Sequence, residues 1–162
     1  MKRIYAALAA GVFGVFLAGT GSSQTPEQLA KPKASPPRLV PVAETKLIMQ
    51  GINQANFQGL EKLLKTKDLD SEGWAFARGQ ALLIAESGNL LMMRPPRNSG
   101  QDAWLKAGME LRDRARDLAR TVSTRDVNRS RAGLTQLAST CNKCHQTFSV
   151  KTRVSAFSNP AP

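Results

Sequence analysis

Apolar residues recur every three or four positions along most of this chain, and this spacing constrains the fold more than any other feature of the sequence. The pattern extends from about residue 42 to residue 154, and Pro95 and Pro96 are the only prolines that interrupt it. No stretch alternates apolar and polar residues as a half-buried strand does. The sequence therefore predicts an all-α fold.

Four long helices are expected, with local signals at their ends. Asp70 or Ser71 can cap the second helix, which must end before Pro95 because proline lacks the N–H donor. Ser99 is the expected cap of the third helix. The connections are short, which makes neighbouring helices antiparallel and predicts an up-down-up-down four-helix bundle with the C-terminal helix as its last member. The expected helices cover about 43–65, 70–94, 99–122 and 123–151.

The two ends of the chain differ in composition from the helical region. Lys2 and Arg3 precede an apolar run and then small polar residues, the layout of a secretory signal peptide. The run is shorter than the about 20 residues that cross a membrane, so a retained membrane anchor is the weaker alternative. Five prolines then indicate an extended linker. The predicted organisation of this periplasmic or otherwise exported protein is a signal peptide at 1–23, a Pro-rich disordered linker at 24–41, a four-helix-bundle domain at 42–154 and a disordered tail at 155–162.

Both cysteines and the single histidine lie within five residues, in Cys141-Asn142-Lys143-Cys144-His145. Cys-x-x-Cys-His is the attachment motif for c-type haem. Residues three and four apart share one face of a helix, so both thiols can form thioethers with one haem while His145 binds its iron from the proximal side. The sequence therefore predicts one covalent haem c, bound through Cys141 and Cys144, with His145 as the iron ligand.

Other uses of this motif fit the sequence less well. A Cys-x-x-Cys redox disulfide of the thioredoxin kind needs a βαβ setting, which the chain lacks. A structural zinc site needs four ligands, and the motif supplies three. A peroxidase-like enzyme needs a distal acid–base group, but the chain has no second histidine. We therefore expect no catalytic residues and no enzyme activity.

The helical pattern with this motif in its last helix resembles the class II c-type cytochromes, the cytochrome c′ and cytochrome c556 family. The likeness covers about residues 43–153, and it includes Trp104, Phe148 and Met49 in addition to the haem motif. It implies a bundle with the haem among its helices, against which Trp104 and Phe148 are candidates to pack. Many members of the family form homodimers, so the resemblance also makes a homodimer a candidate assembly for this chain.

The chain departs from the family at positions that usually contact the haem propionates. Family members often have an arginine in the first helix, where this chain has Thr45 and Lys46. They also often have an arginine directly after the aromatic residue that follows the haem histidine, where this chain has Ser149. Lys46, Lys151 and Arg153 are the remaining candidates, and an exposed role in solvent is the stronger expectation for each.

The group that faces His145 across the iron decides the function. A methionine there makes the iron six-coordinate and raises its potential, which suits electron transfer; an aliphatic cover leaves a five-coordinate site for NO or CO. Met49 is the candidate distal ligand, because the resemblance assigns this position to the first helix. In an antiparallel bundle, the beginning of the first helix lies beside the end of the last, so Met49 and His145 are at the same end. This topological argument alone does not exclude Met92 or Met93, and Met109 is a further candidate.

The predicted function is the transfer of single electrons between redox partner proteins, with five-coordinate binding of NO or CO as the alternative. The net charge of +11 favours partners with acidic surfaces through long-range attraction. Nucleic acid is not an expected partner, because the chain is predicted to be exported and its charges alternate in sign along 112–117, as on a solvated helix face. A membrane is a partner only if the signal peptide is retained.

Overall fold

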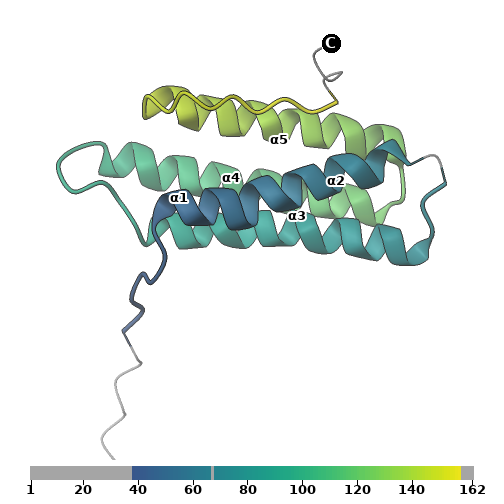
Figure 1. The fold of residues 1–162 in the computed structure, drawn as a ribbon, viewed down its shortest axis with the longest axis horizontal. Coiled ribbons are helices and arrows are strands. Elements are labelled where there is room, and N and C mark those ends of the chain that lie inside the picture. The colour runs from purple at the N-terminus through teal and green to yellow at the C-terminus, as the bar shows by residue number, and fades with distance from the viewer. Residues whose placement is uncertain (1–37, 67, 158–162) are drawn as a thin grey trace, which may run out of the picture. The chain divides into compact units, whose positions relative to one another are not determined.

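The computed structural model describes residues 38–66 and 68–157, and these form an antiparallel bundle of four helical arms, as the sequence predicts (Figure 1). The first arm is one rod in three parts, because a π-helical segment joins two α-helical ones. The predicted signal peptide and most of the predicted linker lie outside the described residues. No helix within the described ranges is long and apolar enough to cross a membrane. The elements are α1 (Thr45–Ile48), η2 (Met49–Gln54), α2 (Ala55–Lys65), α3 (Ser71–Met92), α4 (Gln101–Ser123) and α5 (Val127–Thr147).

Aspartate caps explain where two of the helices begin. The Asp70 carboxylate accepts a hydrogen bond of 2.7 Å from the backbone N–H three residues on, and so caps α3 as predicted. Asp126 caps α5 in the same way at 2.9 Å, so that helix begins a few residues later than expected. The expected cap at Ser99 is wrong: Gly100, in a left-handed conformation with φ of 78°, occupies the N-cap of α4 and makes no side-chain cap.

The core of the bundle is aliphatic and lies where all four arms meet. Its residues follow the three-and-four spacing of the sequence, since each helix turns one apolar stripe inward. α3 packs most extensively against α4, and α5 packs along α4 and also contacts α2. The large aliphatic side chains with 2 % exposure or less are Leu60, Leu64, Ile84, Leu118, Val122, Leu134 and Leu137.

A pair of glycines allows α3 and α4 to approach closely. A Cβ atom added at Gly88 would lie 2.7 Å from the carbonyl oxygen of Gly108 and 2.9 Å from the backbone nitrogen of Arg112. Both of those atoms belong to the backbone of α4, which cannot move aside as a flexible side chain can. The helix crossing therefore requires glycine at position 88.

We expect Gly88→Ala and Gly79→Ala to change stability in opposite directions. The first forces α3 and α4 apart and should lower the free energy of unfolding by about 1–3 kcal/mol. The second adds a methyl group on the same helix where nothing lies within 4 Å. It should raise the free energy of unfolding by about 0.5–1 kcal/mol, because alanine loses less entropy than glycine in a helix. Urea unfolding followed by circular dichroism measures both, and a change of the same sign in both variants would contradict this account.

Candidate functional site

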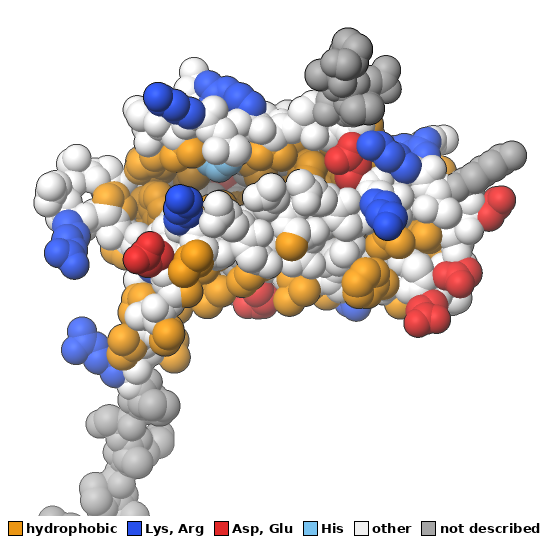
Figure 2. Space-filling model, in the orientation of Figure 1, with side chains coloured by type: hydrophobic (Ala, Val, Ile, Leu, Met, Phe, Trp, Pro, Cys, Tyr) orange, Lys and Arg blue, Asp and Glu red, His pale blue; other side chains and the backbone are white. Residues whose placement is uncertain are grey.

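Burial decreases along the last turns of α5 and along η2, near the end of the bundle where α1 begins. On α5 the last buried residue is Ala138, and the apolar stripe continues through residues that are only half-buried. On the facing rod, η2 contains no buried residue, although Ile48 before it and Phe57 after it are buried. Figure 2 shows hydrophobic side chains along the hollow between α5 and the α1–η2–α2 rod. We call this space the α5–η2 hollow.

Cys141 and Cys144 are both free thiols on the last turns of α5. Cys141 packs against the core, and its burial, with a smaller effect of Cys144, raises the pKa of its thiol to about 12. Burial and the nearby Glu110 carboxylate also raise the pKa of Cys144. Redox-active Cys-x-x-Cys sites have lowered thiol pKa values instead. The surroundings of these two thiols therefore favour the protonated, unreactive form.

His145 is half-buried and has one ring nitrogen committed to a hydrogen bond. Its Nδ1 lies 2.9 Å from the backbone oxygen of Thr152. A carbonyl oxygen can only accept, so Nδ1 carries a proton, and in the neutral ring Nε2 then keeps its lone pair. Histidines that bind metals are commonly held in this way, through a hydrogen bond from the nitrogen that does not bind.

Met49 is the first residue of the π-helical segment and is half-buried against the core. Asn53 donates a hydrogen bond from Nδ2 to the Met49 sulfur at 3.4 Å, and its Oδ1 accepts one from the buried hydroxyl of Ser87 at 2.8 Å. This chain of contacts ties the thioether to α3. π-Helical segments are rare and often occur at functional sites.

The other three internal methionines have surroundings that account for them without a ligand role. Met92 packs across the α3–α4 crossing, with its Cγ 2.7 Å from the position a Cβ would take on Gly108. Met93 is the C-cap residue of α3. The side of α4 that carries Met109 faces outward, since this residue is 42 % exposed. Met49 is therefore the methionine that lies in the segment bordering the α5–η2 hollow.

Trp104 and Phe148, the two aromatic candidates, contact each other. Their ring centroids are 5.0 Å apart at an interplanar angle of 75°, which is the favourable edge-to-face arrangement. Trp104 Nε1 donates a hydrogen bond of 2.6 Å to the carbonyl oxygen of Leu91. The pair joins the beginning of α4 to the end of α5, next to the cysteine motif.

The three basic residues proposed for haem propionates are exposed. Lys46, Lys151 and Arg153 form no ion pair with an acidic side chain within the described ranges. A basic residue that sequence reasoning did not single out has a structural role instead. Arg94 donates from Nε to the carbonyl oxygen of Ala43 at 2.9 Å, which fixes the beginning of the first arm against the end of α3.

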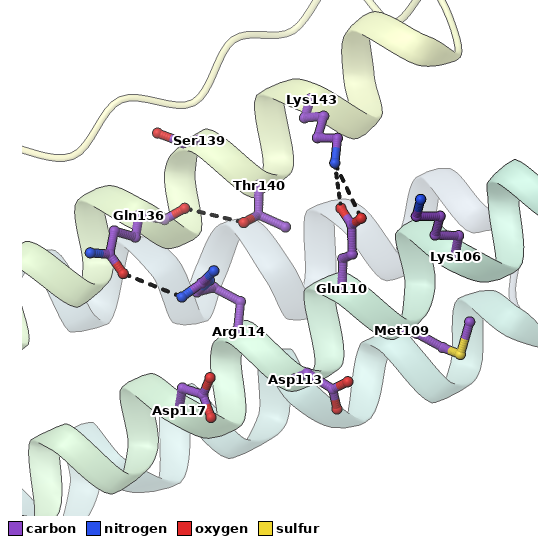
Figure 3. Close-up of a pocket in the computed structure, with 10 residues that line it drawn as sticks. All are labelled: Lys106, Met109, Glu110, Asp113, Arg114, Asp117, Gln136, Ser139, Thr140 and Lys143. Carbon is purple, nitrogen blue, oxygen red and sulfur yellow. Dashed lines mark hydrogen bonds and ion pairs between the residues drawn. The ribbon is translucent and has the colours of Figure 1, made fainter.

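A separate cavity of about 750 Å³ lies between α4 and α5, and its lining is largely charged or polar (Figure 3). Lys143 and Glu110 point toward each other across it and form an ion pair of 3.0 Å. A smaller adjoining cavity of about 130 Å³ is lined in part by Cys144. Neither His145 nor Met49 lines this cavity, so we place the candidate site in the α5–η2 hollow.

The residues around the hollow fit a c-type haem. α5 supplies two protonated thiols one turn apart, of which Cys144 also lines the small cavity toward α4, and a histidine nitrogen that does not bond to the Thr152 carbonyl. The first arm supplies the thioether of Met49. Within 38–66 and 68–157, no three His, Cys, Asp or Glu side chains converge in the manner of a metal site. No protein-family model, curated protein or solved structure matches this chain.

Proposed function

We propose that this protein is an exported c-type cytochrome that carries single electrons between redox partners. One haem would be attached through Cys141 and Cys144, with His145 as the proximal ligand and Met49 as the distal ligand. One observation supports this above all others: the bundle has an apolar hollow where the haem-attachment motif and Met49 come to the same end. The resemblance to cytochrome c′ and cytochrome c556 proteins points the same way.

The hollow needs an occupant on energetic grounds. Half-buried apolar side chains such as Cys141 and Phe148 continue the core stripe of α5, and each Å² of apolar surface removed from water contributes about 25 cal/mol. A flat, apolar macrocycle would cover these side chains and the inner face of η2. A bundle without a ligand would gain by closing this gap with larger side chains.

Each residue around the hollow has a part in this proposal. The two thiols hold the macrocycle, and the free Nε2 of His145 binds the iron, which supplies the one-electron chemistry when present. Asn53 keeps the sulfur of Met49 in place. Trp104 and Phe148 shield the end of the hollow from water, which helps to set the potential.

Charge supports the choice of partner. The net charge of +11 attracts acidic surfaces over a distance, which speeds encounters between proteins. Figure 2 shows Lys and Arg side chains on the face that contains the hollow. We propose acidic redox proteins as partners, and an association rate that falls as salt is added.

Expression with and without a c-type maturation system tests the proposal. We expect one haem per chain that stays attached after unfolding and acid extraction. We also expect low-spin spectra in both oxidation states and slow CO binding, because Met49 has to be displaced first. Fast CO binding by a high-spin reduced protein would instead support the five-coordinate alternative. Absence of covalent haem after maturation would refute both and revive the redox-disulfide hypothesis.

A further inference from the structure

We propose that residues 150–157, here called the C-terminal strap, hold His145 in a single tautomer and ring orientation, with Asn142 as the positioning residue that secures the strap. The consequence of this tautomer for iron binding by His145 rests on the function proposed above. The hydrogen bonds themselves are properties of the polypeptide. They give a defined role to Asn142, the residue that follows Cys141 in the motif, and to the strap that follows α5.

The chain reverses direction at the end of α5 to form the strap. Ser149 has a φ of 56°, in the left-handed region that commonly ends helices. The next N–H, of Val150, donates a hydrogen bond of 2.7 Å back to the carbonyl oxygen of His145. The strap therefore returns along the helix, and its third residue, Thr152, presents its carbonyl oxygen to Nδ1 of His145 at 2.9 Å.

Asn142 fastens the strap to α5 with two hydrogen bonds. Its Nδ2 donates to the carbonyl oxygen of Val154 at 2.7 Å, and its Oδ1 accepts from the backbone N–H of Val154 at 2.8 Å. Both groups of one residue are thus bound by one side chain, so the strap cannot slide along the helix without breaking both bonds. Asn142 and His145 are three residues apart and so neighbour each other on α5. Fixing Val154 therefore fixes the position of the Thr152 carbonyl.

The far end of the strap is anchored to the neighbouring α2 and lies beside Arg131, near the beginning of α5. The N–H of Phe157 donates to Glu61 of α2 at 2.8 Å, and the Arg131 guanidinium lies 6.0 Å from the centroid of the Phe157 ring. Hydrogen bonding from Lys65, and secondarily from Phe157, lowers the pKa of Glu61, so this acceptor is ionised at neutral pH. The strap thus extends from α5 to α2. The part of the predicted disordered tail that the structure describes, residues 155–157, belongs to this packed segment.

A strap that only covered the core would leave the imidazole free to choose its tautomer. Free histidine favours the proton on Nε2, the nitrogen that must be unprotonated to bind iron through that atom. The carbonyl of Thr152 reverses this preference, because it can accept a proton only from Nδ1. The same bond makes a metal-binding imidazole more basic. The tautomer of His145 therefore distinguishes a strap that only covers the core from one that positions the imidazole.

The test compares three variants of the full chain. Asn142→Ala removes both bonds to the strap. Val154→Pro removes one of them from outside the cysteine motif, because proline has no N–H. Asn128→Ala is the matched control, an exposed asparagine on the same helix that makes no side-chain hydrogen bond within the described residues. Circular dichroism first establishes that each variant retains its helices.

Nitrogen-15 NMR of the haem-free chain at about pH 9, where histidine is neutral, gives the tautomer of His145. If the haem-free chain is unfolded, Nδ1–H exchange in the reduced haem protein is measured instead. We expect the Nδ1–H tautomer, and slow exchange, in the unmodified protein and in Asn128→Ala. In Asn142→Ala and Val154→Pro we expect a tautomer mixture, or exchange that is up to roughly tenfold faster.

The reduction potential gives a second readout in the haem protein. A less basic imidazole stabilises oxidised iron less, so both strap variants should have a higher potential than the control. An Nε2–H tautomer in the unmodified chain, or strap variants that match the control in every readout, would overturn the proposal. Failure of haem attachment with the Nδ1–H tautomer intact would count against the proposed function and leave the strap in place. Normal haem attachment with a mixture of His145 tautomers would count against the strap proposal and leave the proposed function in place.

Discussion

Replacing Cys141 and Cys144 together by serine is expected to abolish covalent haem attachment. A hydroxyl does not form the thioether that a thiol forms with the haem, so no covalent bond can replace the lost ones. After expression with a c-type maturation system, haem staining on a denaturing gel should fall from one haem per chain to background. Intact mass should show the polypeptide alone.

The appropriate control for this double variant is Ser139→Ala. Ser139 is exposed on the same helix, and among the residues that the structure describes its hydroxyl bonds only to the carbonyl oxygen of Thr135, at 3.2 Å. It should keep full attachment. Equal haem staining in the double variant and the control would exclude Cys141 and Cys144 as the attachment points, and with them the proposed function.

Replacing Met49 by leucine is expected to convert the protein from the first proposed function to the second. The iron would lose its sixth ligand, so the reduced protein should become high-spin and bind CO rapidly. The reduction potential should fall by on the order of 100 mV, within the about 0.8 V range that axial ligands span. Leucine has nearly the volume of methionine, so stability should fall by less than about 1.5 kcal/mol.

Met109→Leu is the matched control for the distal ligand. It makes the same chemical change on α4, at a side chain that is 42 % exposed. We expect its spectra, CO binding and potential to equal those of the unmodified protein. An unchanged spectrum and potential in Met49→Leu would show that Met49 is not a ligand, even if haem attachment is normal.

The sequence predicts the bundle well because each of its signals is local. Pro95 and Pro96 have no backbone N–H to donate, so α3 has to end before them. The cap of the same helix can be predicted too, because Asp70 is a short polar residue directly before an apolar stripe. The predicted beginning of α4 is wrong because side-chain chemistry and backbone conformation favour different residues there. Ser99 has the chemistry of a cap, but Gly100 has the backbone freedom that this turn needs, at φ of 78°.

The surroundings of the candidate site could not be predicted in the same way. The contact of Asn53 with Ser87 joins residues 34 positions apart, and the contact of Asn142 with Val154 depends on a chain reversal at Ser149. Serine is not a residue that signals a left-handed turn, as glycine or asparagine is. The π-helical segment likewise has no accepted sequence pattern, so the periodicity predicts an ordinary helix there.

The partial burial of Cys141 against the core has a consequence for the order in which this protein is assembled. A maturation enzyme has to reach both thiols, but in the finished bundle the sulfur of Cys141 packs against the core and its pKa is raised to about 12. Under the proposed function, we therefore expect attachment to precede the docking of α5. Because α5 follows the other three arms in the described part of the chain, it would emerge after them during the proposed export. Under the proposed function, the position of the motif would give the enzyme time to act before folding is complete.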